Sequence, residues 1–574
     1  MKLMNKSIYA LLLPLFALAL GAQAQEEKIW ISGASRAIMY GDDYSTGAEN
    51  DTTTARKTQG GHAMVDLGAN IQPSDKILIQ GMVRIRNDYG GFWGSGVTFD
   101  VRQLYIKGII ANSVRYQLGD INYKLTPYTF NNAEDLVNKY NGVISGVPYD
   151  QVRYDVFYYP DDTWRQQGAA VDFALEFDKY IKEMEFNAFT TRVRATNFDT
   201  QDDRLYSGGS VILKQGKHFN VGGQFANLYD FEGTSNNTIY LKNPVVTGTA
   251  EFMHQFDLFD LNVSAEAGRS TLEWQGNEDA PVLEDFFYDA NVKLNLRETG
   301  LSLKAGYRDV GPNFRSAGAQ TMQINYNSVP QAYNRIGNDQ ALRQLSLLDL
   351  SRDASLYRTQ IREGLMIYDP RYNNATPYGR ATPNRRGTEA TLNYENADEI
   401  WGASLTGEFL TNVVGEGTSA LKNYNTVEFG GNVAVDKLVG LQDRHVILST
   451  RLGTQATTRS GDAEYEESDL SSLFGTINLN ATIVGDLEFI AEYRFWQTEG
   501  NDLIAIRDEY SEIIDFREYT TDYNEQILGA GIQYVFSEKT HLRLMYQSFE
   551  WEDAQEASLP YQLDTWTLFF TMKF

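Results

Sequence analysis

Positively charged side chains alternate with apolar ones in several segments of the chain. In the stretch 77–86, Arg84 and Arg86 alternate with Val83 and Ile85. Only an extended strand places successive side chains on opposite faces in this way. The same alternation places the following cations on the polar faces of their predicted strands: Arg84, Arg86, Arg115, Lys293, Lys304 and Arg308. On the wall of a water-filled pore they would attract anions. The alternative is that they pair with inward carboxylates such as Glu488 and Glu492 and only fill the interior.

A second basic feature is the segment 311–386, which carries ten arginines, no lysine and five acidic residues. Five of the 13 prolines of the chain lie in it. A connection of this length is usually functional or disordered, but its leucines and aromatics argue against disorder. We therefore expect a folded loop that is tucked into a lumen as a constriction, or that caps the molecule from outside. The arginines expected to line such a constriction are Arg335, Arg343, Arg352, Arg358 and Arg362.

Catalytic, cofactor and metal sites are not indicated. The five histidines lie in no catalytic motif, and no nucleophile elbow, HExxH or phosphate-binding glycine loop is present. The acidic clusters near residues 42–51 and 462–469 lack the spacing of a calcium-binding loop. We expect no enzymatic activity, no cofactor and no metal site, with an enzymatic barrel as the minor alternative. With no cysteine and a net charge of −26, the chain offers no disulfide framework and no basic surface for nucleic acid.

The first 24 residues predict a secretory signal peptide. Lys2 and Lys6 precede an apolar stretch from Ile8 to Leu20, and Ala22-Gln23-Ala24 forms a cleavage site. The apolar stretch is too short for a membrane-spanning helix. Because no later stretch is long and apolar enough either, a membrane location would require a closed β-barrel formed by residues 25–574.

The C-terminal segment carries the clearest strand pattern. Five large apolar residues stand at two-residue spacing and alternate with polar ones: Trp566, Leu568, Phe570, Met572 and Phe574. Similar alternation recurs upstream, for example over 487–495 and 528–536. A terminal strand with a wide apolar face and a final phenylalanine resembles the signal that the assembly machinery of Gram-negative outer-membrane β-barrels reads. The resemblance implies an exported integral outer-membrane protein in contact with lipid and lipopolysaccharide.

The spacing of these segments predicts an all-β fold, a transmembrane antiparallel β-barrel. We count 23 alternating segments, and since both ends of a single-chain barrel should face the periplasm, we expect 22 to 24 strands. Short periplasmic turns are predicted at 73–76, 111–113, 214–217, 297–300, 484–486 and 537–539. Long extracellular or inserted connections are predicted at 41–60, 121–149, 271–283, 311–386, 456–470 and 499–521.

The early start of strand-like sequence at Ile29 argues against a plugged TonB-dependent receptor and an autotransporter. What remains resembles the porin and substrate-channel superfamily, whose members pass small hydrophilic solutes. From the basic residues we expect passage of small or anionic solutes and a preference for chloride over potassium. The alternative is a non-conducting barrel that binds a surface lipoprotein or a secretion partner through its long loops.

Overall fold

The computed structural model describes most of the chain after the predicted signal peptide. The described residues are 28–46, 56–89, 97–131, 140, 142–146, 164–322, 345–346, 370–441, 444–461, 463, 466–508, 512–555 and 560–574. The proposed signal peptide at 1–24 therefore lies outside them and stays a prediction.

The described chain is built almost entirely of strands. In order they are β1 (Lys28–Thr46), β2 (Arg56–Ser74), β3 (Ile77–Asp88), β4 (Val97–Ile110), β5 (Val114–Tyr123), β6 (Trp164–Glu176), β7 (Glu183–Arg194), β8 (Arg204–Lys214), β9 (Phe219–Asp230), β10 (Tyr240–Gln255), β11 (Phe259–Gln275), β12 (Leu283–Leu296), β13 (Leu301–Val310), β14 (Thr321–Met322), β15 (Leu345–Ser346), β16 (Arg385–Glu395), β17 (Trp401–Thr411), β18 (Asn423–Ala434), β19 (Val446–Arg459), β20 (Ser468–Val484), β21 (Leu487–Arg507), β22 (Ile513–Ser537), β23 (Thr540–Asp553) and β24 (Tyr561–Lys573). Two short helices, η3 (Gly379–Ala381) and α7 (Val435–Val439), lie in connections.

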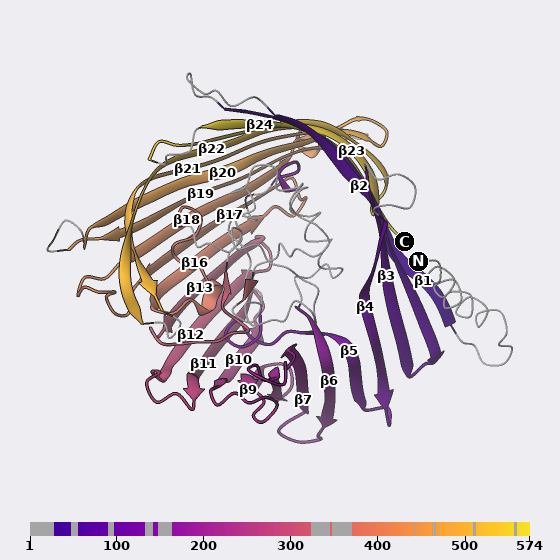
Figure 1. The fold of residues 1–574 in the computed structure, drawn as a ribbon. Coiled ribbons are helices and arrows are strands. Elements are labelled where there is room, and N and C mark those ends of the chain that lie inside the picture. Colours follow the sequence, from indigo (N-terminus) through magenta and orange to yellow (C-terminus); the bar gives the residue numbers. More distant parts are fainter. Residues whose placement is uncertain are drawn as a thin grey trace, which may run out of the picture.

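The strands close into one barrel. All except β14 and β15, which form a separate pair, belong to one 22-stranded sheet in which each strand pairs antiparallel with its neighbours in the sequence. The first and last strands complete the ring, with Ala34 opposite Lys573 and Thr46 opposite Tyr561. Figure 1 shows the strands following one another around the wall. The predicted antiparallel barrel of 22 to 24 strands is confirmed.

The two ends of the barrel differ. At the end where the chain enters β1, strands are joined by short turns such as 75–76, 111–113, 297–300 and 485–486; at the other end the connections include 124–163 and 311–384. Outer-membrane barrels have short periplasmic turns and long extracellular loops. The end that carries both termini is therefore the periplasmic one.

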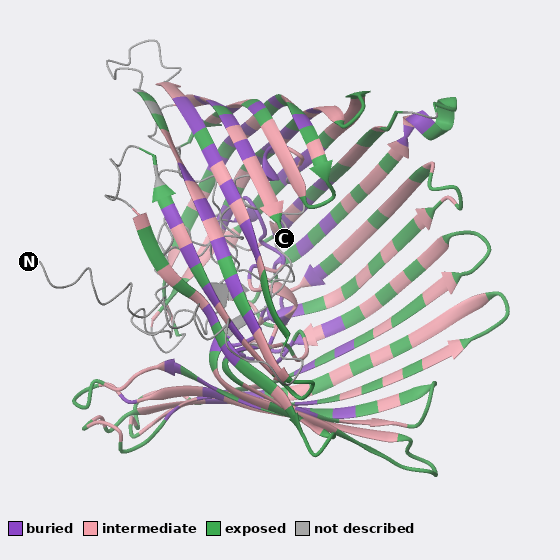
Figure 2. Ribbon diagram, turned by 90° about the vertical axis from the view of Figure 1, so that its right-hand side faces the viewer, coloured by how far each residue is buried: buried purple, intermediate pink, exposed green. Residues whose placement is uncertain are grey.

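The outer wall is apolar and the inner wall is polar. On β24, Trp566 is exposed on the outside, while Thr565 and Thr567 are buried inside. The remaining residues of the predicted assembly signal, Leu568, Phe570, Met572 and Phe574, follow Trp566 on the outer face. Burial alternates along most strands, as Figure 2 shows by the change of colour from residue to residue. An apolar outer face on a closed barrel is what a lipid bilayer requires, so this architecture is that of an integral outer-membrane protein.

Several predicted loops were too long. The range 499–521 is mostly strand, because β21 runs to Arg507 and β22 starts at Ile513. With 21 and 25 residues these strands are about twice as long as the 9 to 11 residues that cross a bilayer. Their extracellular parts have water on the outside as well, so the apolar alternation that marks a membrane strand is lost there. No helix among the described residues has the length and apolar character needed to cross a membrane.

Barrel closure depends on a close approach at Gly33. The backbone N–H of Gly33 donates to the Phe574 carbonyl at 2.9 Å, and the Phe574 N–H donates back at 3.0 Å. A Cβ at Gly33 would lie 2.0 Å from the Asp66 carbonyl oxygen and 3.1 Å from the Phe574 ring. We expect Gly33→Ala to reduce the fraction of the protein that migrates as a folded, heat-modifiable band in outer-membrane fractions.

The matched control is Gly223→Ala on β9, where an added Cβ meets nothing within 4 Å. It should leave the folded band unchanged. Equal amounts of folded Gly33→Ala and native protein would show that this contact is not needed for closure.

Candidate lumenal site

The cations predicted from alternation point inward, but most are paired with carboxylates. Arg84 on β3 lies directly opposite Asp66 on β2. Its Nε donates to Oδ1 at 2.7 Å and a terminal nitrogen donates to Oδ2 at 2.6 Å, and both side chains are fully buried. Arg86 on the same strand is also buried. For Arg84, therefore, the structure has the pairing that we gave as the alternative to a pore-lining cation.

Two further predicted cations are tied to the neighbouring strands β16 and β17. Arg308 on β13 forms an ion pair with Glu408 on β17 and is buried. Lys304, four residues earlier on the same face of β13, donates to Glu389 on β16 at 2.8 Å. Arg115 on β5 pairs with Asp172 on β6 and remains exposed.

Lys293 differs from the others. It lies on β12 directly opposite Lys304 on β13, and its side chain is exposed. Within the part of the chain that the structure describes, it forms no ion pair. Glu389 pairs with Lys304 and with Arg380, so Lys293 is left as an exposed lumenal cation.

Described parts of the connection between β5 and β6 lie in the lumen, where the sequence predicted a long extracellular or inserted connection over 121–149. Phe130 packs against Phe189 and Tyr206 on the wall. Farther along the same connection, Ile144 packs among inward residues of β1, β21, β23 and β24. Its backbone N–H donates to Glu492 Oε2 at 2.6 Å. This connection, which we call insertion A (124–163), therefore touches two separate parts of the inner wall.

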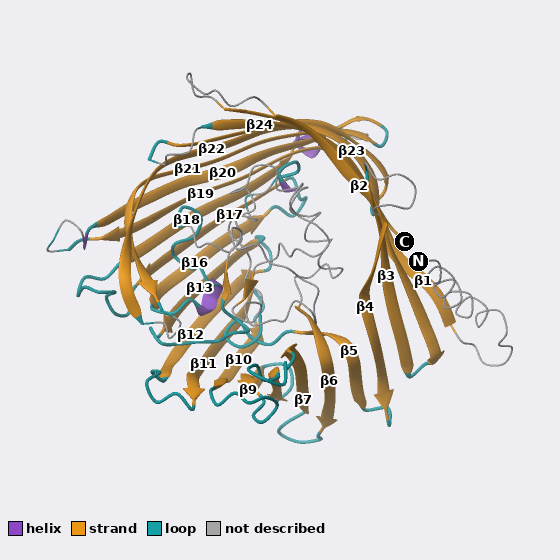
Figure 3. Ribbon diagram, in the orientation of Figure 1, coloured by secondary structure: helices purple, strands orange, loops and turns teal. Residues whose placement is uncertain are grey.

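The described parts of the connection between β13 and β16 also pack against the inner wall. Tyr372 packs against Trp496 and Tyr523 in a buried aromatic cluster that also includes Tyr140 of insertion A. Asn374 donates to Asp502 at 2.9 Å. The described parts of this connection, insertion B (311–384), lie within the ring of strands in Figure 3. The five arginines predicted to line a constriction, Arg335, Arg343, Arg352, Arg358 and Arg362, lie outside the described residues.

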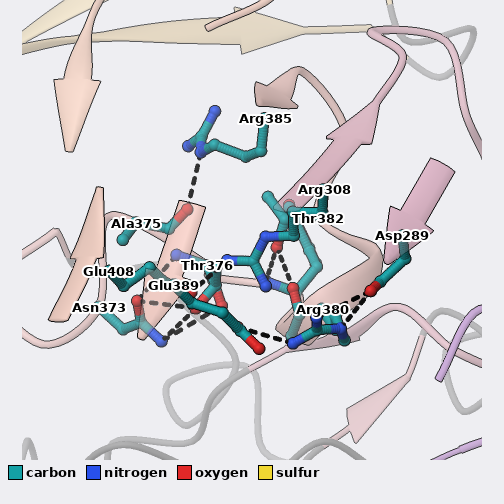
Figure 4. Close-up of polar contacts among 12 residues, drawn as sticks. Asp289, Arg308, Asn373, Ala375, Thr376, Arg380, Thr382, Arg385, Glu389 and Glu408 are labelled. Atoms are coloured by element: carbon teal, nitrogen blue, oxygen red, sulfur yellow. Dashed lines mark hydrogen bonds and ion pairs between the residues drawn. The ribbon is translucent and has the colours of Figure 1, made fainter. Parts of the chain in front are cut away.

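Both insertions bind the same carboxylate on the wall. The Tyr128 hydroxyl of insertion A donates to Asp289 Oδ2 at 2.5 Å. Arg380 of insertion B donates to Asp289 through Nε and, at 3.0 Å, through a terminal nitrogen, and it also donates to Glu389 at 2.8 Å. Figure 4 shows Arg380 between these two carboxylates. Asp289 on β12 is therefore a shared anchor.

The electrostatics of this anchor keep both donors protonated. Burial, reinforced by the Asp289 charge, raises the pKa of the Tyr128 phenol well above its usual value. Burial alone would lower the pKa of Arg380, but the hydrogen bond to Asp289 and the charges of the surrounding carboxylates raise it overall. Both groups thus stay hydrogen-bond donors at any physiological pH.

The insertions also contact each other. The backbone N–H of Asn131 donates to the Gly318 carbonyl at 3.0 Å, and the Ser316 hydroxyl donates to the Thr129 carbonyl at 3.3 Å. Tyr128 meets Phe314 edge to face. Insertions A and B therefore form one packed unit against the wall.

Nearer the periplasmic end, inward side chains such as Arg115, Lys293 and Arg451 remain exposed.

Metal binding finds no support at this site. Within the described ranges, no group of three or more His, Cys, Asp or Glu side chains is placed to hold a metal ion. The carboxylates of the lumen are instead met by arginine, lysine, tyrosine and backbone donors.

Comparisons with known proteins give only a loose likeness. No protein family model and no curated protein matches the chain. Among solved structures, Pseudomonas aeruginosa OccK5 (OpdH) is 10% identical, with 95% of this chain and 98% of that chain covered and a TM-score of 0.34. OpdQ of the same organism has the same identity and coverage and a TM-score of 0.31. An anion-selective porin from Comamonas acidovorans is 10% identical, with 96% and 100% covered and a TM-score of 0.28. At these scores the barrel assignment rests on the strand pairing of this chain itself.

The buried pair of Arg84 and Asp66 allows a test of the pairing. Removal of one partner of a buried ion pair usually costs about 3 to 5 kcal/mol, whereas replacement of both partners by apolar residues is often neutral. We expect Arg84→Met to lower the free energy of unfolding by that amount and Arg84→Met with Asp66→Leu to recover most of it. Urea unfolding of the barrel in lipid vesicles measures both.

The exposed pair of Arg115 and Asp172 is the control, because Arg115→Met should cost less than about 1 kcal/mol at a solvent-exposed site. If Arg84→Met and Arg115→Met cost the same, the buried pair does not stabilise the wall.

Proposed function

We propose that the protein is an outer-membrane channel for small hydrophilic solutes, with a lumen narrowed by insertions A and B. The observation that carries the proposal is the combination of a closed 22-stranded wall with exposed charged residues on the periplasmic side of its lumen. Barrels of 16 to 18 strands enclose an aqueous channel, and 22-stranded outer-membrane transporters have a plugged lumen. The described parts of insertions A and B act as a partial plug in this chain.

The shared anchor at Asp289 gives the plug a defined position. Arg380 and Tyr128 hold the two insertions to one carboxylate in the middle of β12. The width of the passage therefore depends on whether this anchor is formed.

A second candidate is the non-conducting scaffold. The observation in its favour is the tight packing of the insertions, whose aromatic residues Tyr128, Tyr140 and Phe130 are almost completely buried. A sealed barrel of this kind would present its extracellular loops to a surface lipoprotein or a secretion partner. Electrical conductance separates the two candidates.

Single-channel recording in planar bilayers is the direct test. We expect the native protein to give ohmic current steps, and Arg380→Gln to give larger and noisier steps because insertion B loses its bonds to Asp289 and Glu389. Tyr128→Phe should act in the same direction, since it removes the corresponding bond of insertion A.

The matched control is Arg386→Gln. Arg386 also pairs with an aspartate, Asp309, but the pair is exposed. Its loss should leave the current steps unchanged. Absence of steps from both the native protein and Arg380→Gln would reject the channel and leave the scaffold.

Charge selectivity is best tested at an inward cation that has no ion pair among the described residues. Because Arg84 and Arg308 are buried in ion pairs, we place the test at Lys293, which faces Lys304. Rings of lysine or arginine favour anions. We expect reversal potentials in a KCl gradient to show chloride preference, and Lys293→Glu to shift them toward potassium.

Lys437→Glu serves as the comparison, because Lys437 lies in the periplasmic helix α7 and pairs with Glu399. It should shift the reversal potential less than Lys293→Glu does. A potassium preference in the native protein would contradict an anion-attracting lumen.

A further inference from the structure

A polar pocket lies at the extracellular mouth of the barrel, apart from the anchor at Asp289. It has a volume of about 420 Å³ and is formed by the ends of β7, β8, β9, β10 and β11 together with the loops 195–203 and 231–239. Small-molecule sites usually measure about 300 to 1,000 Å³. The pocket is therefore large enough for a solute of one or two sugar rings.

The pocket is built on the lumenal side of the wall. Leu241, which lines it, packs against the buried cluster that contains Phe130 of insertion A and Ala317 of insertion B. Arg204 lies on the same face of β8 as Tyr206, a member of that cluster. A solute that enters from outside would thus meet this pocket before it reaches the insertions.

The charges in the pocket are compensated internally. Asp230 accepts two hydrogen bonds from Arg204, at 2.6 and 2.8 Å, and one from Arg194 at 3.2 Å. It accepts a fourth from the Leu241 backbone N–H at 3.0 Å. The loop 195–203 adds Asp202 as a second negative charge, while Asp203 pairs with Arg192, so no excess of positive charge is offered to an anion. A neutral ligand suits this balance best.

The remaining lining combines an aromatic face with neutral polar groups. Trp274 on β11 supplies an indole ring, and Asn197, Thr200 and Gln201 supply amide and hydroxyl groups. Among the described residues, the Gln201 side-chain amide makes no hydrogen bond, so its donor and acceptor are available. An indole ring covers the apolar C–H face of a sugar, while amides and hydroxyls bind its hydroxyl groups.

The two loops hold the pocket in shape before any ligand binds. The Asn236 N–H donates to the Asp199 carbonyl at 2.8 Å, and the Thr196 hydroxyl donates to the Thr234 carbonyl at 2.8 Å. The Thr234 hydroxyl in turn donates to Asp202 at 3.0 Å. Because these loops are already ordered, little conformational entropy is lost when a ligand binds.

From these observations we propose that this pocket binds a neutral saccharide of one or two rings, with Trp274 under the sugar ring and Gln201 at its hydroxyl groups. The proposal deepens the proposed channel function, because it names the solute class that is captured at the mouth. Saccharide binding does not require ion conduction. An experiment can therefore contradict one of the two proposals without contradicting the other.

The test is isothermal titration calorimetry on the full mature chain in a detergent that has no sugar headgroup. The probes are maltose, cellobiose, glucuronate and arginine. We expect at least one of the two disaccharides to bind, and to bind more tightly than glucuronate or arginine. Trp274→Ala should lower that affinity about tenfold, which corresponds to about 1.4 kcal/mol. Gln201→Ala, a change on a surface loop, should lower it in the same direction.

The control is Trp401→Ala, because Trp401 is exposed on β17 at the periplasmic end, away from the pocket. It should leave binding unchanged. The heat-modifiable band confirms folding of each variant. The proposal is overturned if neither disaccharide binds, if glucuronate or arginine binds more tightly than both, or if folded Trp274→Ala and Gln201→Ala bind as the native protein does. Saccharide binding without any current steps would support the pocket and reject the channel.

Discussion

The constraint on which the whole structure depends is that a sheet in a bilayer cannot have a free edge. Lipid offers no hydrogen bonds, so every backbone N–H and C=O within the membrane must find a partner in the neighbouring strand. The pairing of β1 with β24 meets this requirement, and it brings Phe574 into contact with Gly33 at the periplasmic rim. Once the ring is closed, side-chain alternation fixes one face against lipid and the other against the lumen. The inward position of the charged residues on the wall follows from that closure.

Closure with 22 strands creates a lumen that wall side chains alone cannot fill. Insertions A and B occupy part of this space, and their contacts are of two kinds. Aromatic rings such as Phe130 and Tyr372 pack in buried clusters, whereas Tyr128 and Arg380 bind carboxylates of the wall. Burial of a carboxylate without a partner is costly, so Asp289 and the insertions stabilise each other. The insertions are thus fitted to the wall through charge as well as through shape.

The wall of this barrel was predictable from sequence, because two-residue alternation is a local property that survives without knowledge of partners. The ends of β21 and β22 were not, since their outer faces meet water and the pattern fades there. Insertion A was recognised only as a long connection: the partner of Tyr128 is 161 residues away and that of Ile144 is 348 residues away. Glu492 was correctly placed inward but expected to pair with cations, whereas it accepts backbone N–H groups of Ile144 and Ser145. Which carboxylate binds which donor depends on strand register and on loop folding. Neither can be predicted from the residues next to the carboxylate in the sequence.

Ion selectivity cannot be predicted from the number of inward arginines, because their carboxylate partners cannot be predicted. Arg84 and Arg308 point into the barrel from the wall, Arg380 reaches the wall from insertion B, and each is matched by a carboxylate of the wall. A matched pair contributes little field beyond its immediate surroundings, because the two charges cancel at distances larger than their separation. In the proposed channel, the field that a solute meets would therefore come from inward charges without such a partner, and among the described residues Lys293 is one of them. At the extracellular mouth, Asp230 and Asp202 balance two arginines, so the proposed binding of a neutral solute relies on hydrogen bonds and on the Trp274 ring. In the two proposals, charge acts in the deeper part of the lumen, and shape and hydrogen bonding act at its mouth.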